Sequence, residues 1–121
     1  MEATHPCVCD GGTCIRAGAV NACGEGLEFE LEFRADRVTR VSFSTDACAH
    51  VRAAAGAAAR LAQGRDVSAL SRLDAASILA ELPELPAGER HTAEFVAQAL
   101  AAALRAYLLR RREEPWKRLY R

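Results

Sequence analysis

The chain has 121 residues, half of them hydrophobic, so one domain can bury a core without cross-links. Its 16 basic and 16 acidic side chains give a formal net charge of zero, which argues against a nucleic-acid binder or a protein drawn to anionic membranes. No apolar run approaches the roughly 18 residues that span a bilayer, and the first residues lack the pattern of an export signal. We therefore expect a cytoplasmic protein that binds neither nucleic acid nor membrane.

Five cysteines, all within the first 48 residues, give the first indication of function. Because reducing compartments disfavour structural disulfides, metal binding or redox chemistry is the expected use of these thiols. The first three have the spacing C-x-C-x4-C with glycines between them, which could wrap a metal with Cys23 as a fourth thiolate. Free thiols on a terminal segment are the alternative. The candidate ligands of this second metal site are Cys7, Cys9 and Cys14.

The first predicted elements form an antiparallel hairpin. Residues 27–33 alternate apolar and charged side chains with the two-residue period of a half-buried strand. Residues 34–37 predict a turn, and the β-branched and aromatic residues of 38–45 predict the partner strand. The inner face is expected to hold Leu27, Phe29, Leu31 and Phe33, and the solvated face Glu28, Glu30 and Glu32 opposite Arg40.

Helices are expected after the hairpin. The alanine-rich run 51–62 predicts a helix that ends at Gly64, and a short helix is expected at 75–81. The longest helix is predicted for 92–112, where apolar residues recur every three or four positions before an arginine run that matches a helix C-terminus. The aromatic residues of 113–121 either dock on a partner or pack back on the domain. The predicted fold class is α+β, a small antiparallel sheet packed against helices with a long C-terminal helix.

Metal-ligating side chains fall at the junctions between these elements. Cys23 and Glu25 precede the first predicted strand, Cys48 follows the hairpin, and His91 precedes the last helix, after a loop that two prolines make rigid. Such junctions can meet at one end of a sheet. Two thiolates, an imidazole and a carboxylate suit tetrahedral zinc or the irons of a small iron-sulfur cluster. His50 is either a spare ligand or a surface residue early in its helix.

These segments resemble those of a known family. The run 18–25, with Ala22-Cys23-Gly24-Glu25, is similar to the first-ligand segment of the IscU/NifU-type iron-sulfur cluster assembly scaffolds, where an Ala-Cys-Gly-Asp motif precedes a long strand. Residues 43–49 resemble the second-cysteine segment, and His91-Thr92 resembles the His-Cys pair before the last helix. The resemblance, in order and at similar spacing, covers roughly residues 18–107.

The resemblance implies a domain organisation and a function. The IscU/NifU-like metal-site domain would be 18–112, between a Cys-rich N-terminal segment 1–17 and a C-terminal tail 113–121. The protein would be a scaffold or carrier and not an enzyme, monomeric or homodimeric when free. It would bind a 2Fe-2S cluster, or Zn2+ in its place. The partner would be a cysteine desulfurase or an iron-sulfur acceptor protein. The implied metal ligands are Cys23, Glu25, Cys48 and His91.

The chain also departs from the family pattern. Thr92 replaces the third cysteine, which is implicated in accepting sulfur, and a hydroxyl cannot carry sulfane sulfur. We expect Thr92 to cap the last helix instead. Glu89 replaces the lysine of the family's chaperone-recognition loop, and Glu25 is one methylene longer than the family's aspartate. These departures favour an alternative, a fold recruited as a permanent metal-holding subunit of a larger redox or metalloenzyme complex.

Overall fold

A three-stranded antiparallel sheet and a long helix make the frame of the protein. The computed structural model describes residues 13–21, 24–83 and 90–119, with side chains up to residue 110. The strands, in sheet order, are β1 (Thr13–Val20), β2 (Gly26–Arg34) and β3 (Arg37–Thr45). The helices are α1 (Ala49–Ala62), α2 (Val67–Leu70), α3 (Ala75–Ala80) and α4 (Arg90–Leu119). The α+β fold class and the long C-terminal helix are thus confirmed.

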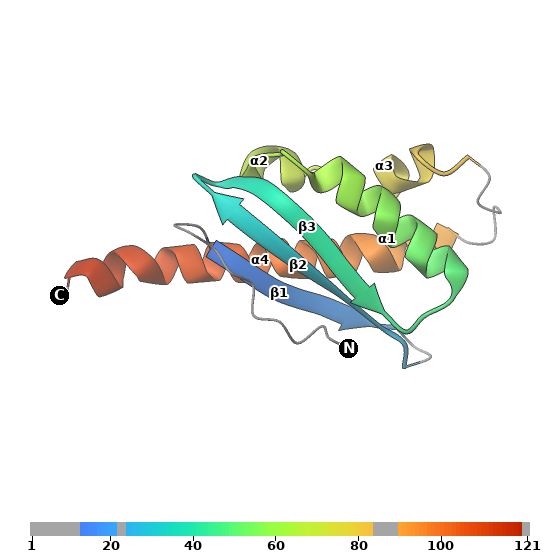
Figure 1. Ribbon diagram of the computed structural model, residues 1–121, viewed down its shortest axis with the longest axis horizontal. Coiled ribbons are helices and arrows are strands. Elements are labelled where there is room, and N and C mark those ends of the chain that lie inside the picture. The colour runs from blue at the N-terminus through green and yellow to red at the C-terminus, as the bar shows by residue number, and fades with distance from the viewer. Residues whose placement is uncertain (1–12, 22–23, 84–89, 120–121) are drawn as a thin grey trace.

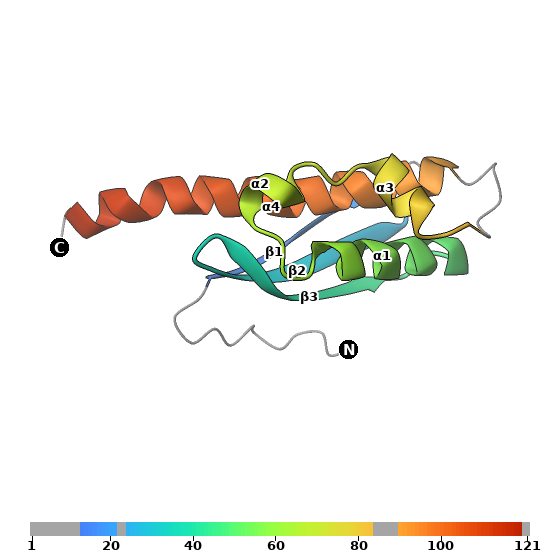
Figure 2. The same ribbon diagram turned by 90° about the horizontal axis from the view of Figure 1, so that it is seen from above.

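The helices cover the sheet on one face (Figures 1 and 2). Helix α4 packs along β1 and β2, and α1 packs against β3 and α4. Helix α3 packs on α1 and α4. The core lies between the sheet and the helices, where α1 presents a row of buried alanines, Ala54, Ala55, Ala57, Ala58 and Ala62. Small side chains let α1 approach its neighbours closely. None of the described helices has the combined length and apolar character that crossing a bilayer requires.

Strand β2 is the centre of the sheet, and its alternation is the one predicted. Its inner side chains, Leu27, Phe29, Leu31 and Phe33, are at most 2% exposed. Complete burial of one such side chain contributes about 1.5–3 kcal/mol. On the opposite face Arg16 lies 3.8 Å from Glu28 and 3.6 Å from Glu30. Arg40 lies 3.9 Å from Glu32, whose side chain is only 10% exposed, so the prediction that Glu32 lies on the solvated face is wrong; the register between β2 and β3 shifts directly after this residue. The pairs that Arg16 makes are more exposed and contribute little, so the buried face fixes the register.

Strand β1 was not expected from the sequence, and it starts within the Cys-rich segment. Ile15 is buried, and Ala17 and Ala19 pack against the core, so one face alternates as in β2. The outward position Gly18 pairs with Glu28, and a Cβ atom on Gly18 would come within 2.7 Å of the Glu28 Cα. Because alanine and glycine are weak strand formers, the sequence pattern gave little indication of this strand.

The turn between β2 and β3 is tied to α4. Ala35 and Asp36 have φ angles of 51° and 64°, and their flanking residues pair, which makes the predicted turn a two-residue hairpin loop of the I′ kind. The Tyr107 hydroxyl donates a hydrogen bond to Asp36 Oδ1 at 2.5 Å. The Tyr107 ring also stacks on Phe33, with ring centroids 3.8 Å apart. The turn is thereby anchored at the end of the sheet where β2 finishes.

Two helix ends differ from the sequence prediction. Helix α4 starts at Arg90 and runs to Leu119, so the expected end at Arg112 is wrong. Strong helix formers fill 108–114, which favours propagation of the helix beyond the arginine run. Nothing in the structure explains how the helix accommodates Pro115. The four-residue helix α2 was also not predicted.

Aspartates cap the short helices. Asp66 Oδ1 accepts a hydrogen bond from Ala69 N at the start of α2. Asp74 Oδ1 accepts from both the backbone N–H and the hydroxyl of Ser77, each at 3.0 Å, at the start of α3. The bond from the Ser77 backbone is the largest cause that holds the pKa of the Asp74 carboxyl below its usual value. A lowered folded-state pKa means that this cap stabilises α3 at neutral pH and is lost as the pH falls through that pKa.

Replacement of Ala35 by glycine should raise the free energy of unfolding. Glycine relieves about 1–2 kcal/mol of left-handed backbone strain in the folded state. It also gives the unfolded chain more conformational freedom, which costs about 0.4–1 kcal/mol of stability. We therefore expect the free energy of unfolding, measured in urea, to rise by about 0.5–1 kcal/mol. The matched control is Gly64→Ala, at a position where φ is +82°. This change should lower the free energy of unfolding by about 1 kcal/mol. A loss of stability in Ala35→Gly would contradict the strain argument.

Candidate functional site

Three chain junctions lie at the same end of the sheet. Figure 1 shows the end of β1, the start of β2, the N-terminus of α1 and the N-terminus of α4 at this end of the molecule. The loop 21–25 joins β1 to β2, residues 46–48 join β3 to α1, and α4 begins at Arg90. This arrangement follows from the antiparallel strand order, which returns the chain to the same end after β1 and β3. The backbone therefore places the three junctions at the same end of the molecule, and the convergence of their side chains stays a prediction.

A network of hydrogen bonds closes the loop that carries Cys23. Asn21 Oδ1 accepts from Glu25 N, and Asn21 Nδ2 donates to Glu25 Oε1, both at 3.0 Å. The backbone N–H of Asn21 donates to the Glu25 carbonyl at 2.9 Å, and that of Gly24 donates to the Asn21 carbonyl at 3.0 Å. Gly24 has a φ of +85°, a conformation that L side chains rarely adopt. The half-buried Glu25 is therefore held back against its own loop.

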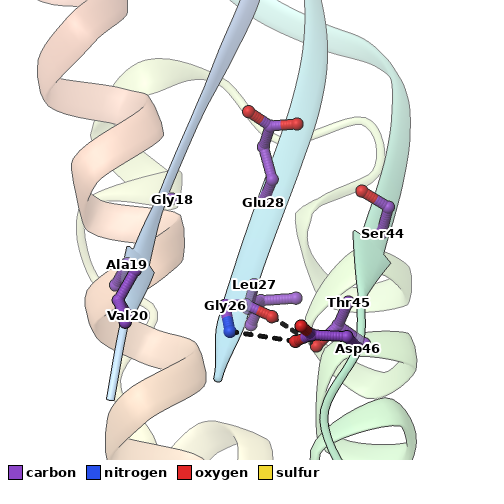
Figure 3. A pocket seen from close by; sticks show the side chains of 9 residues that line it. All are labelled: Gly18, Ala19, Val20, Gly26, Leu27, Glu28, Ser44, Thr45 and Asp46. Atoms are coloured by element: carbon purple, nitrogen blue, oxygen red, sulfur yellow. Dashed lines mark hydrogen bonds between the residues drawn. The ribbon is translucent and has the colours of Figure 1, made fainter. Parts of the chain in front are cut away.

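The same loop is fastened to the segment that leads to Cys48. Thr45 Oγ1 donates to the Gly26 carbonyl at 2.6 Å, and Asp46 Oδ1 accepts from Gly26 N at 3.1 Å (Figure 3). Thr45 Oγ1 also accepts from Ala47 N at 3.0 Å. Beside these bonds lies a hollow, open to solvent, between the ends of the three strands. The Gly26 clamp, as we call these contacts of Thr45 and Asp46 with Gly26, joins two of the predicted ligand segments.

Cys48 carries an accessible thiol at the start of α1. It is free and exposed, and it occupies the N-cap position with extended backbone angles of −71° and 174°. Its carbonyl accepts the first helical hydrogen bond, from Arg52 N at 3.1 Å, while its side chain makes no capping bond. The thiol is thus presented to solvent at the site end, as a metal ligand requires. His50, the second residue of α1, is half-buried.

His91 is the second residue of α4 and is exposed. The neighbouring Thr92 is the third residue of the helix and only 3% exposed, so our expectation that it caps the helix is wrong. The reason is that α4 begins two residues earlier than the sequence suggested. The hydroxyl at the position of the family's third cysteine therefore lies inside the protein. Glu89 falls outside the described residues.

The complete ligand set stays a prediction. Cys23 lies outside the described residues, and among those described no three His, Cys, Asp or Glu side chains are close enough to hold a metal ion. Glu25, Cys48 and His91 therefore do not form a metal-binding group in this structure. What the structure supplies is their common position at one end of the sheet.

The second cysteine cluster also stays a prediction. Cys7 and Cys9 lie outside the described residues. Cys14 lies in β1 and takes part in a disulfide bond, so its sulfur would have to be reduced before it could bind a metal as a thiolate.

Three residues of the site end were not assigned a role from the sequence, namely Asn21, Thr45 and Asp46. A threonine and an aspartate directly before a helix are a recognisable signal, because both side chains readily bond to nearby backbone groups. Their partner Gly26 is about twenty positions earlier in the chain, and no local pattern predicts that contact. The bond between Asn21 and Glu25 needs a loop conformation that the sequence does not specify.

Comparisons with known proteins bear on this site. The family model described as "NifU-like N terminal domain" matches residues 9–114, which is most of the chain. A comparison with curated proteins finds no match. The matched range contains every described element of the sheet and all three junctions at the site end.

Loss of the Thr45 hydroxyl should loosen the Gly26 clamp. In Thr45→Val the Gly26 carbonyl and the Ala47 N–H lose their partner, so we expect the free energy of unfolding to fall by about 1–2 kcal/mol. The control is Thr39→Val on the same strand, whose exposed hydroxyl makes one bond, to the Glu32 carbonyl at 3.2 Å, and which should cost less. Urea unfolding measures both, and equal losses would show that the clamp adds nothing specific.

Proposed function

Since this chain belongs to the family of NifU-like N-terminal domains, the scaffolds of iron-sulfur cluster assembly, we propose that it holds a 2Fe-2S cluster, or zinc in its place, through Cys23, Cys48 and His91, with Glu25 as a further oxygen ligand. Scaffolds of this family are typically not catalysts, and the cluster is their cargo. The function proposed is therefore reversible holding of a metal centre, with a cysteine desulfurase or an iron-sulfur acceptor protein as the partner.

The observation that supports the proposal is that three junctions with candidate ligands lie at the same end of the sheet (Figure 1). Two are joined by the Gly26 clamp, and each described candidate ligand is exposed or half-buried. An exposed thiol, an exposed imidazole and a half-buried carboxylate beside a second cysteine supply the donor types that zinc and small iron-sulfur clusters take. A site at a solvent-facing end also suits cargo that must leave.

The burial of Thr92 supports a protein that holds a metal centre over one that accepts sulfur at this position. Its side chain is 3% exposed and ends in a hydroxyl, which forms no persulfide. Sulfur is therefore not carried to the site by residue 92. In this proposal the thiolates of Cys23 and Cys48 anchor the cargo, and His91 completes the set from the start of α4.

Anaerobic reconstitution with ferrous iron and sulfide tests the proposal. We expect the wild-type chain to develop visible charge-transfer absorption, and Cys23→Ser and Cys48→Ser each to lose it almost completely, because each removes one thiolate anchor. His91→Ala should bind a more labile centre. Metal and acid-labile sulfide analysis of protein purified without oxygen then separates the two cargoes, since zinc without sulfide would identify the zinc form.

The matched control is Cys14→Ser. Cys14 lies in β1 and is not among the proposed ligands. Wild type and variant are both fully reduced before reconstitution, so that the disulfide of Cys14 is open in each, and the variant should then retain the absorption. Unchanged spectra in both Cys23→Ser and Cys48→Ser would refute the proposed site. Loss of absorption in Cys14→Ser alone would instead assign the centre to the N-terminal cysteines.

A second candidate function is that of a fixed metal-holding subunit in a larger redox complex. The observation in its favour is the length of α4, which extends past the edge of the sheet to Leu119 (Figures 1 and 2). Near the point where the helix leaves the sheet, Leu109 is 56% exposed, a large apolar side chain that a partner could cover. Size-exclusion chromatography of the native protein from its own cell extract separates the candidates, because a carrier elutes as a monomer or dimer and a fixed subunit co-elutes with large redox proteins.

A further inference from the structure

We propose that Asn21 is a positioning residue for Glu25 in the metal site, an inference that rests on the function proposed above. Asn21 and Glu25 stand at the two ends of the loop that contains Cys23, and three hydrogen bonds connect them. Two of these bonds use the Asn21 side chain, one from each end of its amide. The amide therefore fixes the loop and the Glu25 carboxylate together.

The chemistry of the amide explains why an asparagine is suited to this position. The backbone N–H of Glu25 needs an acceptor, which Oδ1 supplies, and the carboxylate of Glu25 accepts the proton that Nδ2 donates. An alanine would provide neither group, and an aspartate would provide the acceptor but set a second negative charge against Glu25. A neutral donor leaves the carboxylate its full charge, which a metal ligand must retain.

The contact also determines how Glu25 can bind. Because Oε1 already accepts a hydrogen bond from the Asn21 amide, we infer that Oε2 is the preferred oxygen for a metal and that Glu25 binds through one oxygen. A carboxylate already held in one orientation loses less conformational freedom on binding than a free side chain. Glutamate is a long and flexible residue, and this restraint is what gives it a defined place beside the thiolates.

The Gly26 clamp extends the same restraint toward Cys48. Gly26 follows Glu25 directly, and its N–H and carbonyl are bonded to Asp46 and Thr45. The Glu25 backbone is thus fixed on one side by Asn21 and on the other by the segment before α1. Only the Glu25 side chain remains to be oriented, and the Asn21 amide does so.

Zinc binding by the full chain tests this role through a double-mutant cycle. Zinc affinity is measured by competition with a chromophoric chelator. Only zinc that wild type binds and Cys48→Ser does not is counted as bound at the site. Asn21→Ala should weaken binding about tenfold, the lower range for loss of a group that orients a metal ligand. In a Glu25→Ala background the same change should weaken binding less than about twofold, because the residue through which Asn21 acts is gone.

A matched control removes an amide hydrogen bond elsewhere. Gln63 Nε2 donates to the Thr39 carbonyl at 2.6 Å, toward the other end of β3, and Gln63 is exposed. Gln63→Ala should leave zinc affinity unchanged. Urea unfolding of each variant accompanies the titrations, so that a general loss of stability is recognised as such.

Each outcome decides the matter. Weakening that depends on Glu25 supports the positioning role. If Asn21→Ala weakens zinc binding equally in the wild-type and Glu25→Ala backgrounds, Asn21 serves only loop closure. If binding is unchanged or tighter in Asn21→Ala, the contact does not assist metal binding. Either result overturns the inference while the proposed function stands. A wild-type chain that binds no zinc dependent on Cys48 overturns the inference and the zinc form of the proposed function, whereas reconstitution with iron and sulfide decides the cluster form separately.

Discussion

The register of β2 is the constraint on which the rest of the structure depends. Its inner side chains are essentially inaccessible, and a slip of one residue would turn every one of them to the solvated face, together with the glutamates to the core. That register puts Gly26 opposite the end of β1 and beside the end of β3. The loop with Asn21 and Glu25, and the segment before Cys48, meet for this reason. Burial of apolar side chains thus positions polar groups that contribute little to the core.

The two ends of the sheet are fastened by different interactions. At the end of the β2–β3 turn, Tyr107 stacks on Phe33 and bonds to Asp36, which joins the sheet to α4 through a buried ring. At the site end the fastening consists of the Gly26 clamp and the bonds of Asn21, each worth about 0.5–1.5 kcal/mol net, or about 1.5–3 kcal/mol where a carboxylate accepts the bond. One end of the sheet is therefore held by ring packing and the other by polar bonds.

The sequence predicted those parts of the fold that have strong local signals. The alternation of β2, the hairpin turn and the alanine-rich α1 follow from residue types at short spacing. Strand β1 was missed because its inner face is mostly alanine, and the end of α4 was misplaced because an arginine run is compatible with either a helix end or a continuing helix. At the site, the sequence identified residue types and their common end of the sheet. The contacts of Asn21 and Thr45 arise from the folded loop and have no local pattern.

Thr92 and Glu25 together define what kind of metal site this end of the protein can offer. A thiol at the position of Thr92 could take part in sulfur chemistry only if it were accessible, whereas this side chain is buried in the first turn of α4. Glu25 is restrained by Asn21, so it is suited to a fixed oxygen ligand more than to one that swings in and out of the site. Both features favour holding a centre over building one. In the proposed site, the restraint on Glu25 compensates for the longer side chain that replaces the family's aspartate and gives the carboxylate a defined orientation.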